Sequence, residues 1–118
     1  MISFEKNVLK IDGDSHDLEW PIRDAVEDLG KVYVLLDPDV YLADADYKAG
    51  RRAGVPAIRN LLGMSKLGER LWSAELPESS DYYHAFASTS PLVVYSFSSH
   101  KCEIDVTTGS ILVQEDLK

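Results

Sequence analysis

Histidine, cysteine and aspartate are the residue types in this chain that could hold a metal ion, and their spacing argues against a zinc site. The three histidines, His16, His84 and His100, are far apart in the sequence, and Cys102 is the single cysteine. Zinc sites take their ligands from closely spaced pairs of Cys or His. We therefore expect no bound metal and no cofactor.

The aspartates form short-spaced groups that resemble part of a calcium-binding loop. The first group is Asp12-x-Asp14-x-x-Asp17. An EF-hand loop needs glycine at its sixth position and an acid at its twelfth. Counted from Asp12, these positions hold Asp17 and Arg23, so the pattern does not match. Because aspartate side chains bind their own backbone in turns, this group indicates a turn, as do Asp37-x-Asp39 and Asp44-x-Asp46.

No catalytic nucleophile can be recognised in the sequence. Cys102 stands between Lys101 and Glu103, in a segment predicted to be a strand. A reactive thiolate needs a nearby cation, and the Lys101 side chain points to the opposite face of a regular strand. Gly63-x-x-x-x-Gly68 lacks the Lys-Ser/Thr that completes a phosphate-binding loop. We therefore expect a protein that is not an enzyme.

The net charge is concentrated in the first part of the chain. The chain has 20 acidic and 12 basic residues, a formal charge of −8, and all of this excess lies within residues 1–46. Such a field repels nucleic acid and anionic lipid and attracts a basic partner. We expect no direct binding to nucleic acid or to a membrane. An acidic surface that only keeps the protein soluble is the alternative.

The sequence is typical of a cytoplasmic protein. A single cysteine fits a reducing compartment, and the first residues do not form a secretory signal. The longest apolar run, Val32–Leu36, is far too short to cross a membrane. We therefore expect a cytoplasmic location.

The pattern of short apolar segments predicts a mainly β fold. The chain of 118 residues is long enough for one globular domain over 1–118. Segments of four to seven residues, separated by turn signals, predict antiparallel hairpins arranged as a twisted sheet, a sandwich or a propeller-like structure. The strands expected are 2–5, 8–11, 17–20, 31–37, 57–64, 69–76, 82–88, 92–98, 101–106 and 110–115.

Two segments depart from this pattern. Ile22, Val26 and Leu29 have helical spacing and precede a glycine, which predicts one short helix near 22–29. The stretch 40–56 is irregular and predicts a long surface loop that can carry a helical turn.

Large apolar residues within the predicted strands supply the expected core. Strand 31–37 consists of β-branched and bulky residues, which predicts that both of its faces are covered. The expected core residues are Val8, Ile11, Leu18, Trp20, Val32, Val34, Leu36, Leu61, Leu71, Trp72, Phe86, Val93, Tyr95, Ile104 and Ile111.

Two hairpin motifs in residues 57–116 carry a resemblance to a known group of proteins. The segment 60–72, Asn-Leu-Leu-Gly-Met-Ser-Lys-Leu-Gly-Glu-Arg-Leu-Trp, has a strand, a Lys-x-Gly turn and a returning strand. The segment 103–112 has the pattern Ile-Asp-x-x-Thr-Gly-x-Ile-Leu. This pair resembles small acidic antiparallel-β immunity proteins of contact-dependent growth inhibition and other bacterial polymorphic toxin systems.

The resemblance implies a non-catalytic protein that binds and occludes a cognate toxin, which we expect to be basic. Opposite charge would speed this association. The residues expected to bind the partner are acids of the first part of the chain with two tyrosine anchors: Asp12, Asp14, Asp17, Glu19, Asp24, Glu27, Asp28, Asp37, Asp39, Tyr41, Asp44, Asp46 and Tyr47.

Two alternatives to a toxin inhibitor remain open from the sequence. One is a small scaffold or adaptor domain. The other is a small-ligand-binding or enzymatic domain that uses the 40–56 loop, with Arg51, Arg52 or Arg59 holding an anion. Separately, Tyr82 and Tyr83 are consecutive, so one of them should face outward, where it would suit a protein interface.

Overall fold

The computed structural model describes residues 1–117, which form short strands and two short helices. The elements are β1 (Ile2–Glu5), β2 (Val8–Ile11), β3 (Asp14–Asp17), β4 (Ile22–Asp28), β5 (Lys31–Leu36), α1 (Pro38–Tyr41), α2 (Ala45–Arg52), β6 (Leu61–Ser65), β7 (Arg70–Ser73), β8 (Tyr83–Thr89), β9 (Leu92–Ser96), β10 (His100–Ile104) and β11 (Ile111–Asp116).

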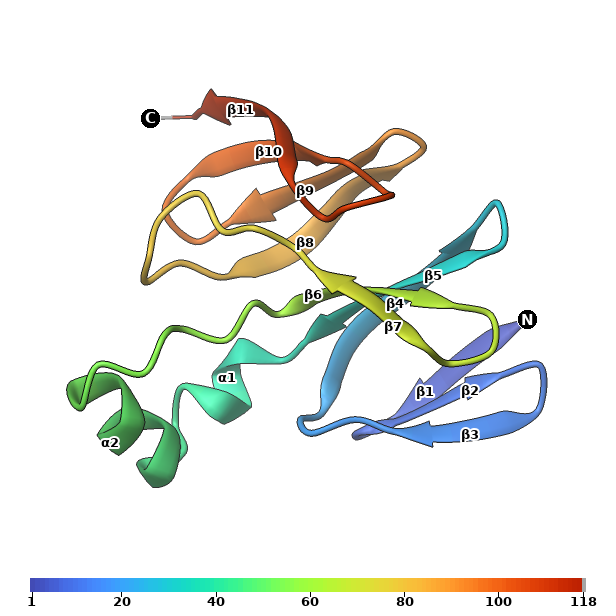
Figure 1. Cartoon of the computed structure of the whole chain (residues 1–118), viewed down its shortest axis with the longest axis horizontal. Helices are drawn as coiled ribbons and strands as arrows, with labels where there is room; N and C mark the ends of the chain where they lie inside the picture. The colour runs from blue at the N-terminus through green and yellow to red at the C-terminus, as the bar shows by residue number, and fades with distance from the viewer. Residues whose placement is uncertain (118) are drawn as a thin grey trace.

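The strands form three antiparallel sheets, each built from strands that are consecutive in the sequence. The sheet orders are β1-β2-β3, β4-β5-β6-β7 and β11-β10-β9-β8. Figure 1 shows the three sheets following one another through the molecule, with both helices at one end of its longest axis. The predicted mainly β architecture of antiparallel hairpins is confirmed. None of the helices among residues 1–117 is long and apolar enough to cross a membrane.

The β4–β7 sheet lies between the other two and has a core on each side. One apolar cluster joins it to β1–β3 and α1, and the other joins it to β8–β11. Within β5, Val32, Val34 and Leu36 belong to the first cluster, whereas Tyr33 and Leu35 belong to the second. This alternation follows from the two-residue period of a strand. The prediction that 31–37 is covered on both faces is therefore confirmed.

The helix predicted near 22–29 is wrong, because residues 22–28 form strand β4. β4 pairs with β5 along its whole length, with a bulge between Ile22 and Asp24. Leu29 and Gly30 both have positive φ, which forms the two-residue hairpin turn that returns the chain into β5. The apolar spacing of this segment fits a helix, but pairing with the buried β5 determines its structure.

The irregular loop predicted over 40–56 is also wrong in part, because α1 and α2 occupy much of it. Asp37 caps α1 by accepting a hydrogen bond from the Asp39 backbone N–H, at 3.0 Å, and Pro38 follows in the first turn. Asp44 caps α2 by accepting from the Tyr47 N–H, at 2.9 Å. Asp37 and Asp44 are therefore helix caps, whereas Asp12 lies in the turn between β2 and β3, as predicted.

The predicted strands after residue 60 are present with changed bounds. The strand predicted over 57–64 begins at Leu61, and the strand predicted over 69–76 shortens to β7. The predicted glycine turns are confirmed by positive φ at Gly68 and Gly109.

Eight of the fifteen expected core residues are buried, and the others are partly buried or exposed. Leu71 is wrong, since its neighbour Trp72 points inward in its place. Val93 and Tyr95 are half-buried because β9 turns Leu92 and Val94 toward the core.

Candidate functional site

The acids expected to bind a partner are divided between two ends of the molecule. Asp12, Asp14, Glu27 and Asp28 lie where the β2–β3 and β4–β5 hairpins turn. Asp37, Asp39, Asp44 and Asp46 lie on or beside the helices. Figure 1 places these regions at opposite ends of the longest axis, which extends 39 Å. One partner surface can therefore include only part of the set.

Several of these acids form ion pairs within the chain. Glu19 binds Arg70 through both carboxylate oxygens, at 2.8 and 2.7 Å. Glu27 forms a close ion pair with Lys66, which also lies 3.9 Å from Asp12. Asp14 and Asp17 are the first and last residues of β3. Both are exposed, and neither forms an ion pair with another described residue. The Asp24 carboxylate accepts the N–H of the next residue, Ala25, at 2.9 Å.

The two tyrosines expected as anchors do not form an exposed pair. Tyr41 is only 1% exposed and packs in the first core cluster against Trp20 and Tyr47. The prediction that Tyr41 contacts a partner is therefore wrong, because its ring is part of the buried core. Tyr47 is half-buried, and its hydroxyl oxygen accepts a hydrogen bond from the Ile58 N–H at 3.3 Å.

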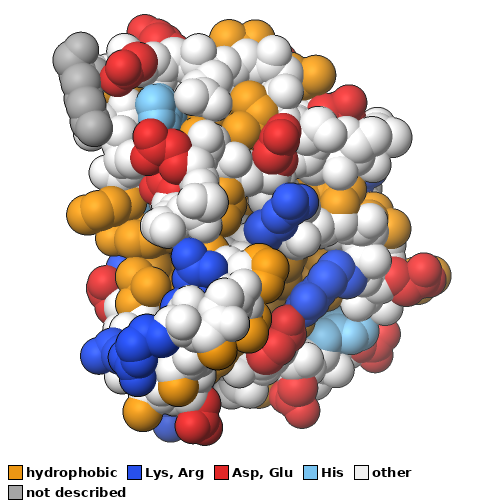
Figure 2. Space-filling model, turned by 60° about the vertical axis from the view of Figure 1, so that its left-hand side comes forward, with side chains coloured by type: hydrophobic (Ala, Val, Ile, Leu, Met, Phe, Trp, Pro, Cys, Tyr) orange, Lys and Arg blue, Asp and Glu red, His pale blue; other side chains and the backbone are white. Residues whose placement is uncertain are grey.

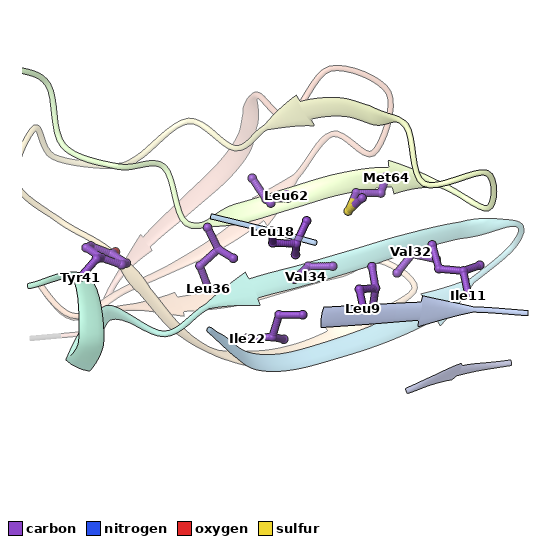
Figure 3. Close-up of a cluster of buried hydrophobic side chains, with 10 residues drawn as sticks. All are labelled: Leu9, Ile11, Leu18, Ile22, Val32, Val34, Leu36, Tyr41, Leu62 and Met64. Atoms are coloured by element: carbon purple, nitrogen blue, oxygen red, sulfur yellow. The ribbon is translucent and has the colours of Figure 1, made fainter. Parts of the chain in front are cut away.

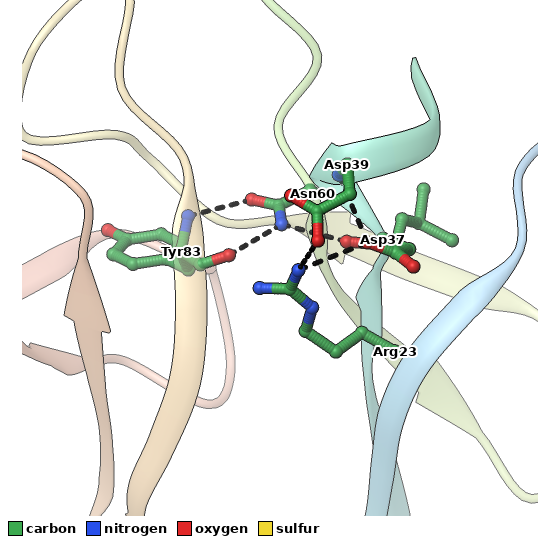
Figure 4. A network of polar contacts seen from close by, with 6 residues as sticks. Arg23, Asp37, Asp39, Asn60 and Tyr83 are labelled. Atoms are coloured by element: carbon green, nitrogen blue, oxygen red, sulfur yellow. Dashed lines mark hydrogen bonds and ion pairs between the residues drawn. The ribbon is translucent and has the colours of Figure 1, made fainter. Parts of the chain in front are cut away.

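Buried Asn60 positions the start of β8. Its side-chain amide donates to the carbonyl oxygens of Leu36 and Tyr83, at 3.0 and 2.7 Å, and its oxygen accepts from the Tyr83 N–H at 2.9 Å. Figure 4 shows this amide between β5 and β8. The Tyr83 ring is fully buried, so strand alternation turns Tyr82 outward. The prediction that one of the two tyrosines faces out is confirmed.

Asp81 holds Tyr82 beside Phe97. Its carboxylate accepts hydrogen bonds from the Tyr82 N–H, at 2.8 Å, from the Ser98 N–H, at 3.1 Å, and from the Ser98 hydroxyl. These contacts join the beginning of β8 to the end of β9. The rings of Tyr82 and Phe97 then stack, with centroids 5.1 Å apart. Phe97 is 67% exposed, which is unusual for a large aromatic side chain fixed by its neighbours.

An exposed carboxylate lies beside this aromatic pair. Arg23 donates to Asp37 at 3.2 Å and to Asp39 at 2.7 Å, as Figure 4 shows, and the Asp39 side chain remains 79% exposed. Burial, and next the Asp39 carboxylate, raise the pKa of Tyr82, whereas Arg23 opposes them. The charge of Asp39 therefore acts on the Tyr82 hydroxyl.

We name Asp39, Tyr82 and Phe97 the aromatic–acidic patch. An exposed carboxylate can bind an arginine or lysine, and a stacked aromatic pair can hold the same cation against a ring face. Tyrosine and other aromatic residues are also enriched at protein interfaces. The patch therefore has the chemistry to bind a basic side chain of a protein partner.

The sequence singled out two members of this patch and missed the third. Asp39 belonged to the expected partner-binding acids, and Tyr82 to the pair of which one faces out. Phe97 gave no signal, because it falls within an apolar strand pattern that also fits a buried residue. The neighbouring Ser98 is bound by Asp81, a contact between segments that are distant in the sequence.

Cys102 and the arginines predicted as anion anchors lie in different environments. Cys102 is fully buried, and burial raises the pKa of its thiol. No group of three or more metal-ligating side chains occurs within residues 1–117. Arg51 and Arg52, predicted as anion anchors, lie together in the last turn of α2, and Arg59 lies in the extended segment that follows.

Comparison with known proteins gives one match. Residues 1–115 match a family described as a domain of unknown function, DUF7957. No curated protein and no solved structure matches the chain.

Proposed function

The chain belongs to the DUF7957 family, and from its own geometry we propose that it is a non-catalytic protein that binds a basic partner protein. The observation that carries this proposal is the exposed ring of Phe97 stacked on the half-buried ring of Tyr82, together with the exposed carboxylate of Asp39, whose charge acts on Tyr82. Binding hot spots combine a rigid aromatic anchor with charge complementarity in this manner.

We propose that the partner is a cognate toxin domain and that the protein acts in the cytoplasm as its immunity protein. The hairpins of residues 57–116 support this through their resemblance to acidic immunity proteins. The charge of −8 also supports it, because an acidic inhibitor attracts a basic toxin over a long range. Binding would occlude the toxin, and the inhibitor itself needs no catalytic group.

The direct test measures the affinity of the protein for the toxin domain encoded beside its gene, together with cell survival when both are produced. The Phe97→Ser and Asp39→Lys variants probe the patch. Each should weaken binding by roughly 30-fold or more, because hot-spot truncation typically costs at least 2 kcal/mol. Survival should fall accordingly.

Matched controls are available on β1. Phe4→Ser removes another exposed phenylalanine, and Glu5→Lys reverses another exposed acid. Both controls should bind within about threefold of the wild type, as expected for residues outside a hot spot. If all four variants bind equally well, the patch is not the interface. If the wild-type protein does not bind the neighbouring toxin domain, the immunity role is contradicted.

A further inference from the structure

A cavity of about 270 Å³ lies where α2 approaches the loop before β8. Its lining includes three cations of α2, Lys48, Arg51 and Arg52, together with Ser80 and the buried Asp81. The cations occupy helix positions i, i+3 and i+4, so one face of α2 carries all three. Figure 2 shows blue Lys and Arg side chains gathered at the lower left, over the helical end of the molecule.

Three cations and one acid, Asp81, line this cavity, so the net charge of its lining is positive, opposite to that of the whole protein. No acidic residue occurs between Tyr47 and Gly68, whereas this stretch has five basic residues in a chain whose net charge is −8. Among the described residues, Lys66 is the one of these five that forms an ion pair. The charges of the α2 cations are therefore not neutralised within the chain.

Arg51 is held in place without losing its charge. Its guanidinium donates to the Val55 carbonyl oxygen at 2.5 Å and to the Ser80 hydroxyl oxygen at 3.1 Å. These acceptors are neutral, and one of them, Ser80, lines the cavity. A guanidinium has five N–H groups, so others remain to donate to a ligand. The Ser80 hydroxyl accepts from Arg51 and can donate its own hydrogen.

The space continues past Arg51. A second hollow, of about 320 Å³, shares Arg51 and Ala57 with the first and adds Pro56, Arg59, Leu76, Pro77, Glu78 and Ser79. Together the two hollows provide a cationic end and a partly apolar end. Such a combination of a few placed polar groups with apolar walls is typical of sites for small molecules.

We propose that this cavity binds the phosphate group of a small phosphorylated metabolite. A doubly charged phosphate suits several cations, and it accepts the N–H fork of arginine, the ammonium of lysine and the hydroxyl of serine together. Cations in the last turn of a helix also stabilise its dipole. That effect does not explain Arg59 or the neutral contacts that hold Arg51. The acidic remainder of the molecule disfavours a long polyanion, so the ligand is small.

Calorimetric titration with pyrophosphate at low salt tests the proposal. The wild-type protein should bind it, and Lys48→Gln and Arg52→Gln should each weaken binding by roughly tenfold, as expected for the loss of one charge-assisted contact. Lys10→Gln is the matched control, because it removes an exposed lysine of β2 outside the cavity. It should bind within about twofold of the wild type.

Three results would overturn the assignment: no binding of pyrophosphate by the wild type, equal weakening by Lys10→Gln and Lys48→Gln, or tighter binding of a single-stranded oligonucleotide than of pyrophosphate. The Phe97→Ser variant should bind pyrophosphate as the wild type does. This separates a failure of the cavity from a failure of the aromatic–acidic patch.

Discussion

The two faces of β5 differ in how they are held to their neighbours. Toward β1–β3, Val32, Val34 and Leu36 pack mainly against aliphatic side chains, which Figure 3 shows as one continuous row. Toward β8–β11, Tyr33 and Leu35 pack in a cluster that includes Trp72 and Tyr83. The first face is stabilised mainly by burial of apolar area, which does not depend on direction.

The second face adds hydrogen bonds between distant segments. The Trp72 indole donates to the Val106 carbonyl at 2.9 Å, the Tyr83 hydroxyl donates to the Glu75 carbonyl at 2.5 Å, and Asn60 joins β5 to β8. Asn60 binds the backbone of Tyr83, the residue that follows Tyr82 of the aromatic–acidic patch. The hydrogen bonds of the second face fix how its segments are oriented. We therefore expect this face to tolerate substitution less well than the first.

The largest effect is expected for Asn60→Ala, at about 3–4 kcal/mol of unfolding free energy. The substitution removes three buried hydrogen bonds and leaves polar groups of Leu36 and Tyr83 unpaired. Asn7→Ala removes one partly buried bond, to the Leu18 carbonyl, and should cost about 1 kcal/mol. Chemical denaturation measures both. Equal losses would mean that Asn60 does not organise this face.

Gly63→Ala should cost about 2–3 kcal/mol, because a Cβ at this position would lie 2.2 Å from the Trp72 ring. The ring has little room to retreat, since the Gly109 backbone lies so close to it that even an added Cβ there would be 2.8 Å from the ring, and its N–H is bonded to Val106. The control is Gly50→Ala in α2, where the nearest side-chain atoms are 3.6 Å away. It should stabilise the protein slightly, by roughly 0.5 kcal/mol. Thermal unfolding distinguishes the two.

Much of this layering could be predicted from the sequence, because it depends on local pattern. The apolar run of β5 predicted burial on both faces, and Gly109 marked the last hairpin. The helix predicted over 22–29 failed because its apolar spacing is satisfied equally by a bulged strand paired with β5. A strand with apolar residues at consecutive positions, as in β9, does not indicate which face is buried.

The candidate sites were less predictable, because they depend on contacts between distant segments. Asp39 and Tyr82 attracted notice by residue type, but their proximity requires Arg23 on β4 and Asp81 before β8. The arginines of α2 could be named as anion anchors, whereas the cavity beside them is formed with Ser80 and Asp81. Such long-range pairing leaves no local signal in one sequence.

Two tyrosines on opposite sides of the β4–β7 sheet allow a smaller, signed test. The Tyr83 hydroxyl is bonded, whereas the buried Tyr41 hydroxyl has no hydrogen-bond partner among the described residues. Tyr83→Phe should therefore destabilise the protein by about 1 kcal/mol. Tyr41→Phe should be neutral or stabilise it by up to about 1 kcal/mol, because it removes an unpaired polar group. Destabilisation by both variants to the same extent would remove the distinction between the two faces.

The smallest effect is expected at the surface pair that ties the end of the first sheet to β7. The hydrogen bonds from Arg70 lower the pKa of Glu19 below its ordinary value of 4.5. A lowered pKa means that the pair stabilises the fold above about pH 4.5 and that this contribution is lost as the pH falls through the lower, folded pKa. Glu19→Gln should cost roughly 0.5 kcal/mol at neutral pH, since the pair is exposed. Denaturation curves of the variant and the wild type should converge in acid, and a difference that persists there would show that Glu19 acts through packing and not through its charge.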